Sequence, residues 1–184
     1  MAQPIRGSFE RIKTDESGAA GIEFTLIAPL FIILMFSAFT IFDLFRADSI
    51  ADKATFTIGD FMSRQTEATD PVFKQVKDMM QRLARNDVGQ PLIRISSITR
   101  MSEEPNGFSV DWTYNSGSGE LSAKDIDLTK LPDIAVNDSI ILTETYVNVY
   151  PFMAIVIGEK NGLFTFEHNA VTRPRFVGRI VKPG

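Results

Sequence analysis

The stretch Phe24–Phe42, FTLIAPLFIILMFSAFTIF, decides how the chain is organised. It contains no ionisable side chain, and as a helix rising about 1.5 Å per residue it spans roughly 28 Å, the thickness of one hydrocarbon core. Apolar residues occupy every face of that helix, which is typical of a membrane span. A secretory signal peptide has a shorter apolar run followed by a cleavage site between small residues. Here the run is followed by Asp43-Leu44-Phe45-Arg46, so we expect the segment to stay attached.

The sequence predicts a specific local effect for two residues of this region. Pro29 lacks an N–H group and is expected to leave the carbonyl of Thr25 free, which bends or loosens the helix. Asp43 is expected at the outer membrane boundary, where its spacing allows a local ion pair with Arg46. Basic residues flank the span on both sides, and this weak signal favours a short N-terminus inside and the larger part of the chain outside.

The composition excludes several functional classes. The chain has 184 residues and a net charge of −4, so no general basic field is present to attract nucleic acid, and we expect no nucleic-acid partner. It contains no cysteine, which excludes thiol catalysis, thiolate metal sites and disulfides. With 44% hydrophobic residues it can fold one modest domain beside the membrane span.

An acidic residue, Glu23, stands directly before the apolar run. A carboxylate at the start of a bilayer-length helix is costly to bury unless water or a cation accompanies it. One interpretation is an ordinary first-turn acid that favours the positive end of the helix dipole. A second interpretation depends on the residues around it, GAAGIEF from Gly18 to Phe24.

Residues 18–29, GAAGIEFTLIAP, resemble the opening of TadE/TadG-like pilus assembly proteins, which are relatives of the class III (type IVb, Flp-type) prepilins. In those prepilins an aspartyl peptidase cuts after a glycine, and an acidic residue lies five residues beyond. The resemblance implies cleavage between Gly18 and Ala19, with Glu23 followed by Phe24 where Flp pilins typically have Tyr. It also implies that the new α-amino group of Ala19 pairs with Glu23 of a neighbouring helix.

Beyond the membrane the sequence predicts two helical segments. Spacings of three and four residues indicate that the first helix continues outward with one narrow apolar face. Thr69-Asp70-Pro71 predicts the start of a second helix over residues 72–87, with Phe73, Val76, Met79 or Met80, and Leu83 facing inward. The apolar face of the first helix consists of Ala47, Ile50, Ala51, Ala54, Ile58, Phe61 and Met62.

The second half of the chain predicts strands. Alternating or β-rich runs, with turn signals at Pro105-Asn106-Gly107 and Asn161-Gly162, predict an antiparallel sheet of about four strands. Between the two pairs of strands, residues 121–139 are expected to form a short helix or turn. The four strands are expected over residues 92–101, 107–115, 139–152 and 163–176. Tyr150-Pro151-Phe152 and the basic residues after the last strand resemble the end of TadE-like domains.

No constellation for catalysis, cofactor binding or metal binding is expected. The single His168 has no second His or Cys and is interpreted as polarity at a surface or strand edge. Asp125 and Asp127 lack the glycine and the distal Glu of a calcium loop. The basic tail, which comprises Arg173, Arg175, Arg179 and Lys182, is interpreted as a solvated edge, with acidic lipid or a partner subunit as the alternative.

These observations predict an α+β protein with a long N-terminal transmembrane helix and a small periplasmic domain. The resemblance implies a minor pilin or pseudopilin that acts in assembly or initiation of Flp-type (tight adherence) pili and is not an enzyme. The implied location is the bacterial inner membrane, in a single pass with the N-terminus cytoplasmic, and with pilus association open. The expected segments are a cytoplasmic leader (1–18), a transmembrane helix (19–46) and a periplasmic domain (47–184).

The implied partners are the prepilin peptidase, the major Flp pilin, other minor pilins, the inner-membrane assembly platform and membrane lipid. Two alternatives stay open. One is an uncleaved membrane-anchored binding module or adhesin, in which Gly18 is never cut. The other is a periplasmic hydrolase, which would have to use His168.

Overall fold

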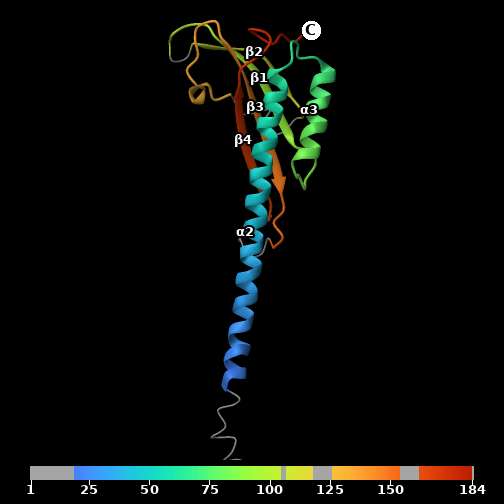
Figure 1. Cartoon of the computed structure of the whole chain (residues 1–184), viewed down its shortest axis with the longest axis vertical. Coiled ribbons are helices and arrows are strands. Elements are labelled where there is room, and N and C mark those ends of the chain that lie inside the picture. The colour runs from blue at the N-terminus through green and yellow to red at the C-terminus, as the bar shows by residue number, and fades with distance from the viewer. Residues whose placement is uncertain (1–18, 105–106, 118–125, 154–161, 184) are drawn as a thin grey trace, which may run out of the picture.

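The computed structural model describes residues 19–104, 107–117, 126–153 and 162–183. Helix α2 forms a long rod whose N-terminal half stands clear of the other elements, while its C-terminal half lies along the sheet (Figure 1). The predicted α+β class, with one long apolar helix and an antiparallel sheet, is confirmed. The elements are α2 (Ala19–Ser63), α3 (Asp70–Leu83), β1 (Leu92–Arg100), β2 (Phe108–Asn115), β3 (Ser139–Val149) and β4 (Phe164–Thr172).

Helix α2 is continuous over 45 residues. It passes through Pro29 and remains α-helical, so the expected loosening does not interrupt it. The most apolar window of the helix has a mean hydropathy of 2.3 and is only 6% buried. An apolar surface of this length, left uncovered by the rest of the chain, is compatible with a single-pass membrane anchor.

The C-terminal half of α2 packs on the sheet through small side chains. Ala47, Ala51 and Ala54 are buried, and Ile58 and Met62 follow on the same face, as the spacing predicted. Close approach of the helix also requires Gly59. A Cβ atom at this position would lie 3.1 Å from Cγ2 of Thr172 on β4, and the Gly59 carbonyl accepts a hydrogen bond of 3.1 Å from the Thr172 hydroxyl.

The sheet has the order β2-β1-β3-β4 with every pair antiparallel. The two predicted hairpins are therefore joined through their first strands, which places β1 and β3 at the centre, where almost every residue is buried. On the face away from α2, Arg94 stands directly opposite Glu144. Its Nε and Nη2 atoms donate to the two carboxylate oxygens at 2.6 and 2.8 Å, and this bidentate pair favours the observed register of β1 and β3.

Helix α3 packs over β1 and β2, on the same face of the sheet as α2. The Phe73 ring stacks on Tyr114 with centroids 3.9 Å apart and meets Trp112 edge-on at 5.9 Å, while Val76 and Met80 are fully buried. The helix ends at Leu83, which is 42% exposed, so the predicted inward position of Leu83 is wrong.

The ends of the strands differ from the prediction for an identifiable reason. Strand β3 ends at Val149 and β4 at Thr172, several residues earlier than expected. Pro151 and Pro174 follow these ends, and a proline cannot donate to the ladder. On the outer face, Ile98, Ile140 and Leu142 pack beneath residues 126–134, which include the expected short helical turn at Leu128–Lys130.

Enlarging Gly59 should separate α2 from β4. We expect Gly59→Leu to lower the free energy of unfolding of the full chain in detergent by about 1–3 kcal/mol, because the new side chain meets Thr172 and Ala170. The single tryptophan, Trp112, reports unfolding by its fluorescence. Gly21→Leu is the matched control, since nothing lies within 4 Å of a Cβ there. Equal stability of the two variants would contradict close helix–sheet packing at Gly59.

Candidate functional site

The residues singled out from the sequence lie at the free end of α2. Gly18 is outside the described residues, and Ala19 is the first residue of the helix. Glu23 is exposed and forms no ion pair with any described residue, while Phe24 is 72% exposed. The described elements leave this end of the helix uncovered (Figure 1). A carboxylate and an apolar surface are therefore available together to another molecule.

An apolar groove lies where the free half of α2 meets the first residues of β4. Its volume is about 660 Å³. Phe164 and Phe166 form one wall, and Ile41, Leu44 and Phe45 of the helix form another. Ser37 and Asp48 supply its polar atoms. The groove extends the exposed apolar surface of the helix onto the edge of the sheet.

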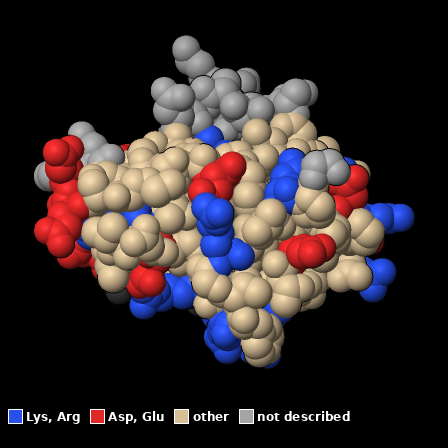
Figure 2. All heavy atoms as spheres, turned by 90° about the horizontal axis from the view of Figure 1, so that it is seen from above, with Lys and Arg blue, Asp and Glu red and all other residues tan. Residues whose placement is uncertain are grey.

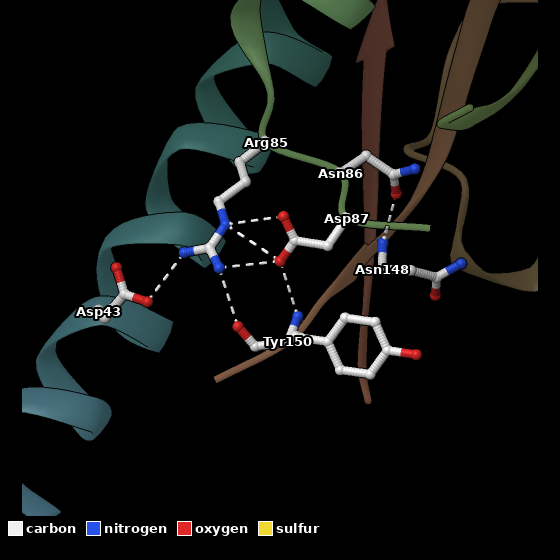
Figure 3. Close-up of polar contacts among 6 residues, drawn as sticks. All are labelled: Asp43, Arg85, Asn86, Asp87, Asn148 and Tyr150. Atoms are coloured by element: carbon white, nitrogen blue, oxygen red, sulfur yellow. Dashed lines mark hydrogen bonds and ion pairs between the residues drawn. The ribbon is translucent and has the colours of Figure 1, made fainter. Parts of the chain in front are cut away.

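A polar cluster at the same level consists of Asp43, Arg85, Asp87 and Tyr150, and we call it the Arg85 cluster (Figure 3). The guanidinium of Arg85 donates hydrogen bonds to three residues at once. Nη1 donates to Asp43 of α2 at 2.8 Å, Nε donates to both oxygens of Asp87 at 3.0 and 3.1 Å, and Nη2 donates to the Tyr150 carbonyl at 2.8 Å. The cluster fastens the helix to the segment after α3 and to the end of β3.

The charges of the Arg85 cluster stabilise one another. The side-chain hydrogen bond from Arg85 lowers the pKa of Asp87, and the amide of Tyr150, which donates to the same carboxylate at 2.8 Å, lowers it further. The pKa of Arg85 is raised, first by its hydrogen bond to Asp87 and then by that to Asp43. The guanidinium is therefore held in its charged form between two carboxylates.

The segment after α3 pairs with β3 in an extended form. The Asp87 amide donates to the Asn148 carbonyl at 2.7 Å, and the Asn148 amide donates to Oδ1 of Asn86 at 2.7 Å (Figure 3). The predicted continuation of the second helix to residue 87 is wrong because these bonds replace it. The local pair of Asp43 with Arg46 is likewise replaced by the pair with Arg85.

Sequence reasoning missed this cluster, although one signal was present. Asp43 is a carboxylate at the end of an apolar run, and such a group requires a cation or water nearby. Arg85 supplies the cation from a position 42 residues away in the chain. Periodicity within one element cannot identify such a partner, because the contact depends on how α3 turns back toward α2.

His168 lies on the edge strand β4, in agreement with the strand-edge interpretation, but it is not open to solvent. Its side chain is only 13% exposed, because α2 covers that face of β4. Nε2 lies 3.1 Å from Asp48, and Nδ1 lies 3.6 Å from Asp52, one turn further along α2. The two carboxylates face different ring nitrogens and do not share one point with the imidazole. Within the described ranges, no group of three or more His, Cys, Asp or Glu residues could hold a metal ion.

The remaining polar candidates have structural roles or lie outside the described residues. Asp125 is outside them, and Asp127 caps the short helical turn by accepting from the Thr129 amide at 3.1 Å. The end of the molecule opposite the free half of α2 shows basic and acidic side chains interspersed (Figure 2). The residues of the basic tail have partners within the chain. Arg173 pairs with Asp138, Arg175 with Asp60 and Arg179 with Asp111, while Lys182 lies over the Phe73 ring.

The described residues thus bring together the exposed apolar half of α2 with Glu23 at its start, a groove where this half meets β4, and a polar cluster that fixes the helix to the sheet. The surfaces that are accessible to another molecule are the free half of α2 and the groove where this half meets the start of β4. No family model matches the chain, and no curated protein or solved structure matches it either.

The Arg85 cluster should make the free energy of unfolding depend on pH in the acidic range. We expect Asp87→Asn to lower the free energy of unfolding near neutral pH by about 1 kcal/mol, because an amide nitrogen would then face the guanidinium. The folded pKa of Asp87 lies below its ordinary value of 3.8, so its contribution is present above that value and is lost as the pH falls through the folded pKa.

Denaturant unfolding of the full chain in detergent, followed over a range of pH, measures this effect. The difference between wild type and Asp87→Asn should vanish in acid. Asp78→Asn, an exposed residue on α3, is the matched control and should show no difference at any pH. A loss for Asp87→Asn that stays constant down to acidic pH would contradict the ionic origin of the effect.

Proposed function

We propose that this protein is a minor pilin or pseudopilin that acts in assembly or initiation of Flp-type pili. The observation that carries the proposal is the form of α2. Its N-terminal half is an exposed apolar rod, and its C-terminal half continues without a break into the packing of a four-stranded sheet. A subunit of this shape presents a helix for lateral packing and places a folded domain at the outer end.

The helix surface supports packing against other subunits. The apolar side chains Phe24, Leu30, Phe31 and Leu34 are each more than 60% exposed. The groove between α2 and β4 continues this surface outward. A neighbouring apolar helix would therefore find a continuous lining from the membrane span to the base of the sheet.

Glu23 provides the specific contact in the proposed mechanism. It is exposed and has no cationic partner among the described residues. Cleavage after Gly18 would create an ammonium group on Ala19, and this group on an adjacent helix would offset the cost of burying the Glu23 carboxylate. Leader removal would thereby permit lateral packing of helices in the membrane.

In this proposal the protein lies in the bacterial inner membrane with a cytoplasmic leader and a periplasmic sheet domain. Its partners are the prepilin peptidase, the major Flp pilin, other minor pilins, the assembly platform and the surrounding lipid. The role is architectural and involves no catalysis, because the subunit primes or caps the pilus through helix packing.

Leader cleavage is the direct test. We expect mass spectrometry of the membrane protein to find an N-terminus at Ala19 when an Flp-type prepilin peptidase is co-expressed, and an intact leader without it. Gly18→Ala should abolish the change. If the leader stays intact while a control pilin is cut, the processed-pilin proposal fails and an uncleaved membrane-anchored binding module becomes the better account.

The role of Glu23 needs a separate test. We expect Glu23→Ala to leave membrane insertion unchanged but to reduce recovery of the mature protein with the major pilin by an order of magnitude, about 1.4 kcal/mol. Cross-linking followed by co-purification measures this recovery. Asp52→Ala, a carboxylate on the same helix beyond the membrane, is the comparison variant. Equal recovery of wild type and Glu23→Ala would contradict the proposed pairing.

A further inference from the structure

We propose that Phe152, in the connection between β3 and β4, inserts its ring into the bilayer leaflet that faces the sheet domain and forms a second membrane contact beside α2. Phe152 would then act as a small interfacial anchor of the sheet domain. The ligand is the lipid surface itself. This inference needs no partner subunit and does not depend on the pilin proposal.

The position of Phe152 along α2 is the first argument. Its ring lies 6.3 Å from the ring of Phe36 and 5.6 Å from that of Phe39, measured between centroids. Both helix residues belong to the uncharged run that ends at Phe42. Phe36 lies about 9 Å and Phe39 about 5 Å inside that end along the helix axis, which is the depth that interfacial side chains reach. A bilayer that surrounds Phe36 and Phe39 must therefore also reach Phe152.

The exposure of Phe152 is the second argument. Its side chain contacts the helix on one side, yet 61% of the residue is exposed. Tyr150, two residues earlier, is 45% exposed. Aromatic residues of this kind, with an apolar ring near lipid and a hydroxyl-bearing ring closer to water, are enriched at membrane interfaces. Pro151 and Met153, the immediate neighbours of Phe152, carry no ionisable side chain that would oppose insertion.

The Arg85 cluster supplies the third argument. It joins the first charged residue after the uncharged run, Asp43, to Tyr150, which is two residues before Phe152. Asp43 directly follows the uncharged run, and its carboxylate is paired with Arg85 at 2.8 Å. The same guanidinium binds the Tyr150 carbonyl at 2.8 Å. Tyr150 is therefore held beside Asp43, at the end of the uncharged run (Figure 3). The Phe152 ring lies against Phe36 and Phe39, which are within that run.

The absence of cysteine from the sequence makes a direct test simple. The full chain is reconstituted in phosphatidylcholine vesicles as single-cysteine variants that carry a nitroxide label. Phe152→Cys tests the proposal, Phe39→Cys is the bilayer reference, and Phe176→Cys is the aqueous reference. Phe176 is 71% exposed and lies beyond β4, next to the far end of α2, where the neighbouring Arg175 amide binds the Ser63 carbonyl.

The readout is the collision rate of each label with oxygen, which concentrates in lipid, divided by that with a water-soluble nickel chelate. We expect the ratio at residue 152 to be several-fold above that at residue 176 and close to that at residue 39. Met153→Cys is a second labelled site in case Phe152→Cys fails to fold, which Trp112 fluorescence reports. A ratio at these sites equal to that at residue 176 would overturn the proposal. Protection of the label from both reagents would also overturn it, because a protein partner would then cover the site.

Discussion

The division of one unbroken helix into an exposed apolar half and a half that packs against a sheet is the constraint on which the structure depends. Helix α2 has no linker between its exposed apolar half and the half that Ala47, Ala51 and Gly59 press against the sheet. Small side chains are needed on the second half because they bring the helix backbone close to β4. Large exposed side chains dominate the first half, and Phe152 and the start of β4 approach the helix near the end of that half.

The change of environment along α2 explains the Arg85 cluster. Asp43 is the first ionisable residue after the uncharged run, and its carboxylate needs a cation at the edge of the hydrocarbon. Arg85 meets that need while it also joins Asp87 and the Tyr150 carbonyl. Through Arg85, the Asp43 carboxylate thus connects α2 to the segment after α3 and to the end of β3.

Much of the fold follows from the sequence because its signals are local. The apolar face from Ala47 to Met62, the two hairpins and the short helical turn all came from periodicity and turn residues. Contacts between distant segments could not be read in this way. The pairing of β1 with β3, the burial of His168 beneath α2 and the partner of Asp43 each depend on tertiary packing. Glu23 and Phe24 are exposed at the free end of α2, and their role in assembly stays a prediction that rests on the resemblance.

The continuity of α2 also couples rotation in the membrane to rotation outside it. Successive residues of an α-helix are offset by about 100° around the axis. If the face of α2 that packs against a neighbour slips by one residue, the whole sheet follows through the same angle, since no hinge lies between Phe42 and Ser63. The orientation of the sheet about the helix axis is therefore tied to that of the exposed apolar half, and a small change of helix register there would turn a different surface of the sheet toward a partner.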